Sequence, residues 1–241
     1  MWADLRAALS FLTILPLGDA QGRKPGWSFA WYPLVGLLIG AALALTAALS
    51  PLHGGITSFL VLLAWVVITG GLHLDGFGDS CDGLLAAVEP ARRLAIMKDP
   101  RAGSWAVVGL ALLLLGKWTA LATVPPALLI LPPVVGRWAM VIAAYSFPYA
   151  RQTGLGAYFR DGLGRAQVIT ATAVALVAAA ASAREVVPLW TAFIIGGATV
   201  FVVGRWAARR LGGGLTGDVY GALCELTELL CLLGLSAWAN A

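Results

Sequence analysis

Charged residues are scarce in this sequence, since Asp, Glu, Lys and Arg together make up only 12% of its 241 residues. Soluble domains carry about 25% charged residues and about 45–50% apolar ones. Here 60% of the residues are hydrophobic, and the mean hydropathy is +0.86. This composition excludes an ordinary soluble protein and predicts one integral membrane domain that extends over residues 1–241.

Several sequence signals are absent as well. The three cysteines, Cys81, Cys224 and Cys231, form no CxxC pair, which is the usual sign of a zinc site or a redox dithiol. The basic residues form no dense block and no nucleic-acid-binding motif, so the net charge of +4 predicts no nucleic-acid partner. The N-terminal stretch carries Asp4 and lacks a small-x-small cleavage site. It therefore predicts a retained interfacial or re-entrant helix instead of a signal peptide.

Long apolar runs are abundant. A membrane-spanning helix needs roughly 20 mostly apolar residues. The apolar runs lack the alternation of a barrel strand, and only helices or closed barrels span a bilayer. The sequence therefore predicts an all-α, polytopic membrane helix bundle with about seven transmembrane helices. Their predicted ranges are 29–50, 56–72, 105–123, 126–146, 166–183, 187–204 and 219–239.

The basic residues gather in alternate loops. Most of the 16 lie before the first span or in the loops 73–104, 147–165 and 205–218, whereas the opposite loops contain only Arg184. Because cytoplasmic loops carry the excess of Lys and Arg, the N-terminus is predicted inside and the C-terminus outside. Most acidic residues follow the same division. The polar chemistry is therefore expected on the cytoplasmic face.

The stretch "HLDGFGDSCDGL" brings three carboxylates together. Asp75, Asp79 and Asp82 have the spacing i, i+4, i+7, which places them within about 60° of one another on a helix. Such like charges repel unless a cation lies between them, and a hard divalent ion such as Mg²⁺ or Mn²⁺ fits oxygen ligands. The glycines at 76, 78 and 83 favour the close approach of a ligand. The alternative is a solvated helix end with one Asp as an N-cap.

A second acidic group begins the last span, in "GDVYGALCELTELL". Asp218, Glu225 and Glu228 lie largely on one face of the predicted helix. Ionisable residues inside a span are costly and mark function by default. Asp218 and Glu225 are therefore expected as further metal ligands. A structural pairing of Glu225 or Glu228 with Lys117 or Arg137, the two cations within spans, is compatible with that role.

Basic residues near the acidic cluster are candidates for phosphate binding. Lys98 and Arg101, in "MKDPRAGSW", offer a point charge and a bidentate fork, although ordinary loop charge explains them too. Lys117 lies further into its span and either snorkels to the surface or belongs to the site. His73 borders the aspartates and has either a structural or an acid–base role.

Four stretches occur together in one order: "ALSFLTILPLG", "GGLHLDGFGDSCDGL", "MKDPRAGSWAVVGL" and "GGGLTGDVYGALCELTE". In these the sequence resembles the cobalamin synthases, which are membrane-bound adenosylcobinamide-GDP ribazoletransferases. The resemblance runs nearly end to end. It implies a Mg²⁺-dependent enzyme that joins adenosylcobinamide-GDP to α-ribazole, or to its 5′-phosphate. The products are adenosylcobalamin, or its 5′-phosphate, and GMP.

The resemblance also implies a place and partners for the protein. It implies the prokaryotic cytoplasmic membrane, with the lipid bilayer, a homo-oligomer and other cobalamin-pathway enzymes as partners. The catalytic segments are then 70–104 and 205–228, on the cytoplasmic side. Asp79, Asp82 and His73 become the catalytic candidates, because a carboxylate without metal or the imidazole can accept the ribazole hydroxyl proton.

The loop 147–165 is expected to contact the large corrinoid substrate. Arg151 and Arg160 are candidates for holding the guanosine diphosphate, and Tyr158 for contacting the extended ring. Aromatic residues at a membrane boundary are equally expected without any ligand.

Two other classes remain as alternatives. A membrane transporter would suit the intramembrane charges, but the acids lie on one face and internal repeats are faint. "DSCDG" also matches the DxxDG start of the CDP-alcohol phosphotransferase signature, whose later part this sequence lacks. That likeness indicates an analogy of chemistry and not common ancestry.

Overall fold

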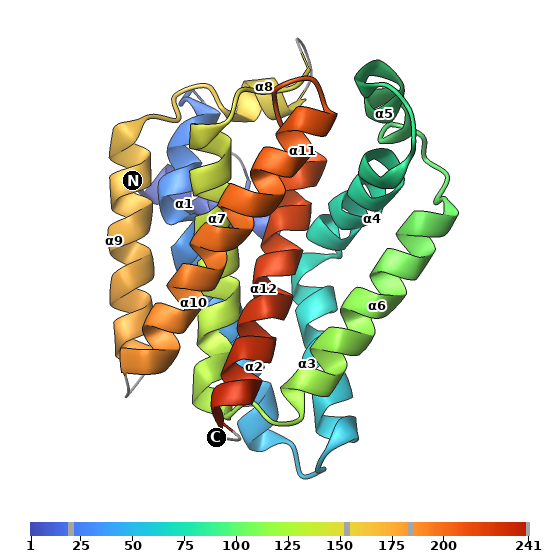
Figure 1. Cartoon of the computed structure of the whole chain (residues 1–241). Helices are drawn as coiled ribbons and strands as arrows, with labels where there is room; N and C mark the ends of the chain where they lie inside the picture. The colour runs from blue at the N-terminus through green and yellow to red at the C-terminus, as the bar shows by residue number, and fades with distance from the viewer. Residues whose placement is uncertain (19–21, 152–154, 183–185, 240–241) are drawn as a thin grey trace.

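The protein is a bundle of helices (Figure 1), and this computed structural model describes residues 1–18, 22–151, 155–182 and 186–239. Within those ranges the secondary structure is helical, apart from one isolated parallel bridge between Tyr149 and Leu215. The predicted all-α class is therefore confirmed. The elements are α1 (Trp2–Leu12), η1 (Pro25–Trp31), α2 (Tyr32–Leu49), α3 (Gly55–Thr69), α4 (Leu72–Leu85), α5 (Pro90–Ile96), α6 (Ser104–Leu121), η2 (Pro126–Ile130), α7 (Leu131–Ser146), α8 (Leu155–Phe159), α9 (Arg165–Ser182), α10 (Val186–Thr199), η3 (Val200–Gly204), α11 (Arg205–Arg210) and α12 (Gly217–Ala239).

The membrane spans agree with the predicted count. Among the described residues, six helical stretches are long and apolar enough to cross a membrane, and a bent pair of helices makes up to seven. The six are Pro25–Leu49, Ser104–Leu121, Pro126–Ser146, Arg165–Ser182, Val186–Arg210 and Gly217–Ala239. The bent pair is α3 with α4.

The predicted span 56–72 corresponds to α3, which ends earlier than predicted, at Thr69. The chain bends by 91° between α3 and α4. Gly70 and Gly71 adopt φ values of +60° and +68°, a left-handed conformation that glycine adopts without steric cost. The bend turns α4 toward α12 and α6, against which it packs.

The span predicted at 187–204 is longer than expected. α10 continues through the π-helical turn η3 into α11, so residues 205–210 are helical instead of belonging to a loop. Arg184, the cation predicted at the opposite end of the bundle, lies outside the described residues.

The N-terminal helix α1 does not span the bundle, because it has only 11 residues. Its Asp4 is buried and forms a bidentate ion pair with Arg23, with distances of 2.6 and 2.8 Å. Burial alone would raise the pKa of Asp4, but the hydrogen bonds and charges of Arg23 and the N-terminal amine hold it below its usual value. This pair ties α1 to the chain that leads into α2.

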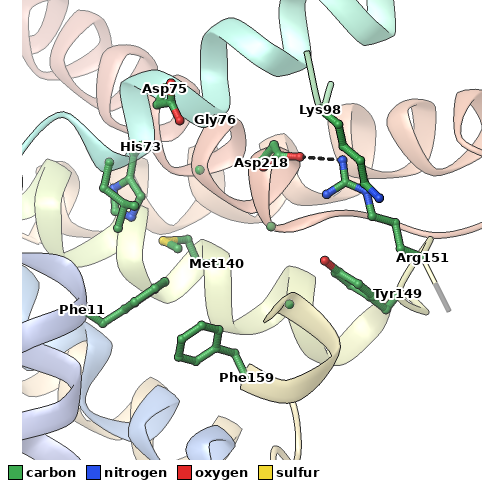
Figure 2. Close-up of a pocket in the computed structure, with 14 residues that line it drawn as sticks. Phe11, His73, Asp75, Gly76, Lys98, Met140, Tyr149, Arg151, Phe159 and Asp218 are labelled. Carbon is green, nitrogen blue, oxygen red and sulfur yellow. Dashed lines mark hydrogen bonds and ion pairs between the residues drawn. The ribbon is translucent and has the colours of Figure 1, made fainter. Parts of the chain in front are cut away.

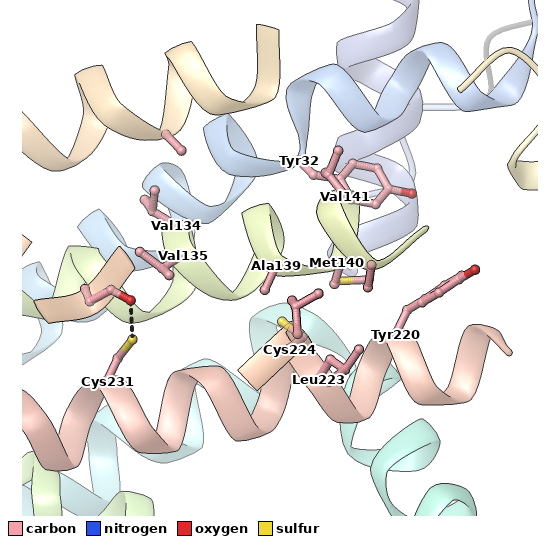
Figure 3. Close-up of a cluster of buried hydrophobic side chains, with 14 of the residues drawn as sticks. Tyr32, Val134, Val135, Ala139, Met140, Val141, Tyr220, Leu223, Cys224 and Cys231 are labelled. Carbon is pink, nitrogen blue, oxygen red and sulfur yellow. Dashed lines mark hydrogen bonds between the residues drawn. The ribbon is translucent and has the colours of Figure 1, made fainter. Parts of the chain in front are cut away.

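The core lies between α7 and its neighbours α2 and α12 (Figure 3). Val134, Val135 and Ala139 of α7 are fully buried, as are Cys224 and Cys231 of α12. Small residues let helices in a bilayer approach closely and gain van der Waals contact. The two cysteines are free thiols, so the structure gives them a packing role in the core.

The two ends of the bundle differ in their content of charged residues, as the predicted loops do. Figure 1 places α5, α8 and α11 at one end, and the C-terminus at the other with the α2–α3 and α6–α7 connections. The basic helix α11 and the charged segments that follow α4 and α7 therefore lie at the same end.

Candidate active site

The charged part of α4 meets the start of α12 at a cavity of about 410 Å³ (Figure 2). Asp75, Lys98, Arg151 and Asp218 line one part of it. Apolar side chains, including those of Phe11, Met140 and Phe159, line another part. We call this space the aromatic cavity.

A second cavity of about 330 Å³ adjoins the first. Polar groups of Asp79, Asp99 and Arg101 line it, and we call it the polar cavity. Asp75 and Lys98 line both cavities. The carboxylate of Asp75 and the ammonium group of Lys98 therefore lie where the aromatic cavity meets the polar cavity.

The two helices that form this junction touch at a glycine. A Cβ atom on Gly76 of α4 would lie 2.9 Å from the carbonyl oxygen of Asp218 and 3.0 Å from its Cα. Because the contacted atoms are backbone, the clash can be relieved only by moving α4 or α12. Gly76 therefore sets the distance between Asp75 and Asp218.

Gly76→Ala is expected to push α4 away from α12. The rate of the transfer reaction that the resemblance implies should fall at least about tenfold, since small displacements of positioned groups are costly in catalysis. Gly197→Ala in α10 is the matched control, because a Cβ there meets no atom within 4 Å. Activity and melting temperature measured in lipid nanodiscs check this. Equal activity of the two variants would show that the α4–α12 distance is not critical.

The other glycines of α4 also serve helix packing. A Cβ on Gly78 would touch Leu110 and Ala106 of α6, and one on Gly83 would lie 2.2 Å from Cγ of Met97. Gly76 and Gly78 also line the two cavities, so the sequence interpretation that these glycines admit a ligand stays a prediction beside their role in packing.

The prediction that Asp75, Asp79 and Asp82 share one helix is confirmed by α4. Asp79 is half-buried and experiences electrostatic repulsion from Asp218, Asp75 and Asp82. Among the described residues, however, no three His, Cys, Asp or Glu side chains stand close enough together to form a metal site. The metal-ligand roles therefore stay predictions. What the structure shows is that Asp75, Asp79, Asp82 and Asp218 are close enough for their negative charges to repel one another.

Asp82 has a different set of partners from the other two aspartates. Its carboxylate accepts hydrogen bonds from the backbone N–H of Gly103 at 2.7 Å and of Ala106 at 3.0 Å. These groups belong to the N-terminus of α6, whose N–H groups lack partners within the helix. Asp82 thus caps α6 from another helix and fixes the segment that carries Lys98 and Arg101. The N-cap alternative holds for Asp82, but on α6 instead of on its own helix.

Glu225 and Lys117 lie together, deep in the bundle. Lys117 Nζ is 2.6 Å from Glu225 Oε2 and 2.5 Å from Glu228 Oε2, and Arg137 Nη1 donates to Glu228 Oε1. All four side chains are buried. The structure thus shows the structural pairing that the sequence left open. The predicted roles of Glu225 as a metal ligand and of Lys117 in phosphate binding stay predictions beside this pairing.

The remaining basic candidates differ in their surroundings. Arg151 Nη2 lies 3.2 Å from Asp218 Oδ2 at the aromatic cavity, and Lys98 is exposed between the cavities. Arg101 borders the polar cavity and pairs with Asp99, and hydrogen bonds from Arg101 lower the pKa of Asp99 to about 2. Asp99 therefore stays ionised at neutral pH.

Arg160 and Tyr158, the other predicted substrate contacts, lie at the edge of this region. Arg160 donates to the carbonyl of Phe147 at 2.9 Å, which braces the loop that follows α7. Tyr158 is 62% exposed and packs edge-on against Phe159. Neither of the two lines the aromatic or the polar cavity.

Sequence reasoning missed Phe11 and Met140. Phe11 lies on α1, and its ring is 4.8 Å from that of Phe159. Its stretch "ALSFLTILPLG" was recognised as a family motif but was assigned to a membrane interface. Nothing in the spacing of α1 signals that this helix folds back against α8.

An apolar helix bundle with two adjoining cavities, lined by both charged and aromatic residues, defines a polytopic membrane protein. The sequence profile of the cobalamin-5-phosphate synthase family matches residues 4–236. The chain belongs to this family of enzymes.

Curated relatives cover nearly the whole chain. One from Stutzerimonas stutzeri is 41% identical over 244 residues, which span 96% of this chain and 97% of the relative. One from Syntrophobacter fumaroxidans is 40% identical, over 96% of this chain and 97% of the relative. One from Herpetosiphon aurantiacus is 38% identical, over 100% of this chain and 98% of the relative. All three are named adenosylcobinamide-GDP ribazoletransferase. No solved structure matches the chain.

Proposed function

We propose that this protein joins adenosylcobinamide-GDP to α-ribazole, or to α-ribazole 5′-phosphate, and releases GMP. The family membership supports the reaction, and the meeting of the two cavities at Asp75 and Lys98 supports this site for it. A transfer between two large substrates needs two binding regions that share one reacting centre. Membership of a synthase family also favours transfer over transport.

The polar cavity suits the guanosine diphosphate end of the first substrate. Lys98 supplies a point charge to phosphate oxygens, and Arg101 supplies a planar fork once it turns from Asp99. The aromatic cavity suits α-ribazole, because Phe11 and Phe159 offer faces to a flat heterocycle. The diphosphate then lies against Asp75 and Lys98, between the two chambers.

The transfer itself needs one bond formed and one broken. A ribose hydroxyl of α-ribazole attacks the phosphorus that is linked to cobinamide, and the bridging oxygen leaves with GMP. The hydroxyl proton passes to a carboxylate, for which Asp79 is a candidate. The cations Lys98 and Arg151 stabilise negative charge on the phosphates as it shifts toward the leaving group.

Magnesium fits the donor set at the junction. In proteins Mg²⁺ is commonly held by one or two carboxylates together with substrate phosphates and water, so it does not need three protein ligands in advance. Asp75, Asp79 and Asp218 would hold it, and their mutual repulsion is relieved by a cation. When bound, the ion neutralises charge on the diphosphate.

The proposed location is the cytoplasmic membrane, with the charged end of the bundle on the cytoplasmic side. The excess of Lys and Arg in the segments at that end supports this orientation. It also places the cavities on the side where nucleotides are available.

Purified protein in nanodiscs, given adenosylcobinamide-GDP, α-ribazole and Mg²⁺, is expected to release one GMP for each cobalamin formed. Leaving out α-ribazole should stop GMP release, and EDTA should stop it until Mg²⁺ is restored. Chromatography of the corrinoid and the nucleotide measures both products. Absence of GMP release under these conditions would refute the proposed function.

A further inference from the structure

His73 is a buried polar side chain on the wall of the aromatic cavity. It is 3% exposed, and its Nε2 atom has no hydrogen-bond partner among the described residues. Buried polar groups are nearly always hydrogen-bonded, and an exception calls for an explanation. A ligand in the cavity is one source of the missing partner.

The other ring nitrogen of His73 fixes where the hydrogen lies. Nδ1 is 3.5 Å from Nη2 of Arg137. A guanidinium group has donors and no acceptor, so Nδ1 must accept and carries no hydrogen. The imidazole is then neutral with its hydrogen on Nε2, because the partner of one ring nitrogen sets the tautomer of the other. His73, a residue that lines the cavity, therefore carries a buried N–H donor without a partner among the described residues.

Arg137 is itself held in place by a charge-balanced cluster. It donates to Glu228, which also accepts from Lys117, and Lys117 binds Glu225 as well. Two cations face two carboxylates, and each of the four residues is at most 5% exposed. Arg137 is thereby fixed as a donor toward His73.

The position of His73 indicates which kind of acceptor it meets. Figure 2 shows the cations Lys98 and Arg151 near Asp218 on one side of the cavity, whereas His73 lies on the other side, between Asp75 and the apolar side chains of Phe11 and Met140. Phosphates belong with the cations. A neutral donor away from those cations suits a neutral acceptor on a flat ring.

We propose that Nε2–H of His73 donates a hydrogen bond to the free ring nitrogen of the benzimidazole base of α-ribazole. This inference rests on the proposed function. The base has two ring nitrogens, of which one is bonded to ribose and the other has an unshared lone pair. Arg137 is a positioning residue that acts through His73. The hydroxyl proton consequently goes to a carboxylate, since the lone pair of His73 faces Arg137.

The tautomer can be observed without any activity. The chain has two histidines, and His53 is exposed in the connection between α2 and α3, so His53→Gln leaves His73 as the only one. ¹⁵N NMR of this variant, labelled with ¹⁵N-histidine in nanodiscs, is expected to show hydrogen on Nε2 alone at neutral pH. Arg137→Gln, whose amide can donate or accept, should allow both tautomers. A hydrogen on Nδ1 in the His53→Gln protein would overturn the proposal.

The acceptor is tested by kinetics with two substitutions and two substrates. His73→Leu is expected to raise the KM for α-ribazole about tenfold, the cost of one lost hydrogen bond, with kcat within about threefold. His73→Gln keeps an N–H donor near the position of Nε2 and should restore most of the affinity. An indole analogue of α-ribazole, with C–H in place of the free nitrogen, should bind the wild type and His73→Leu equally.

The outcomes separate this inference from the proposed function. A wild type that has the expected tautomer but releases no GMP would refute the proposed function and with it the assigned acceptor. An active wild type in which both His73 variants lose kcat at unchanged KM would identify His73 as a base and overturn the inference. Melting temperatures of the two variants verify that each is folded.

Discussion

Asp75→Asn is expected to lower the rate of transfer at least about a hundredfold. Among the described residues, Asp75 is the one carboxylate residue that lines both cavities, where the diphosphate is proposed to lie. Asparagine keeps the size of the side chain but removes its charge, and so weakens any hold on a divalent cation. Metal ions contribute several kcal/mol to such transfers, and each 1.36 kcal/mol is a factor of ten in rate.

The measurement is GMP release at saturating substrates while Mg²⁺ is titrated. Loss of a metal ligand should move the Mg²⁺ requirement to higher concentration as well as lowering the maximal rate. Asp161→Asn is the matched control, because Asp161 is exposed and forms only a surface pair with Lys24 at 3.2 Å. Surface pairs of this kind contribute about 0–1 kcal/mol.

A rate for Asp75→Asn close to that of Asp161→Asn would contradict the assignment of Asp75. A lowered rate with an unchanged Mg²⁺ requirement would keep Asp75 in the site but remove it from the metal. The second result would shift the proposed ligand role to Asp79 and Asp218, which share the same field of charge.

Local patterns predicted those parts of the site that lie within one element. The spacing of Asp75, Asp79 and Asp82 predicted one helix, and α4 is that helix. The stretches around Lys98 and Asp218 were also recognised as parts of one site, and both residues line the aromatic cavity. In each case the signal is contained in a few consecutive residues.

Hydropathy did not predict the bend before α4. The run from α3 continues through Thr69 to Leu72 without a charge, and two glycines alone do not reveal whether a helix ends. The left-handed conformation of Gly70 and Gly71 became visible only in three dimensions. That bend directs α4 against α12, so the shape of the site depends on it.

Contacts between distant segments were the least accessible to sequence reasoning. Lys117 and Glu225 are 108 residues apart, and their contact requires α6 and α12 to pack in one register. The charge of each residue marked it as unusual within a span, which left metal binding and ion pairing as compatible explanations. Only the packing of the bundle revealed the ion pair.

Glu228→Gln is expected to destabilise the protein by about 3–5 kcal/mol, the cost of breaking a buried ion pair by removing one partner. Glu228 is completely buried and accepts hydrogen bonds from both Lys117 and Arg137. Glutamine has nearly the same shape, so the change leaves packing intact and removes one negative charge. Two buried cations then face Glu225 alone.

The expected loss of stability comes from the unbalanced positive charge, and a second substitution tests this cause. Lys117→Met combined with Glu228→Gln removes one cation and one anion, so Arg137 and Glu225 remain with opposite charges. Most of the lost stability should return in the double variant, although the separate contact of Lys117 with the ring of Trp65 is lost. Neighbouring residues in one network are expected to show such non-additivity.

Melting temperature in nanodiscs measures both effects. A loss of 3–5 kcal/mol corresponds to a fall of about 10 °C for a chain of this length. Glu89→Gln is the control, because Glu89 is exposed and its side chain caps no helix. A double variant less stable than Glu228→Gln alone would show that the contacts of Lys117, and not the balance of charge, hold α6 to α12. Because Arg137 also orients His73, Glu228→Gln should in addition disturb the His73 tautomer, which links the stability of this cluster to the binding of α-ribazole.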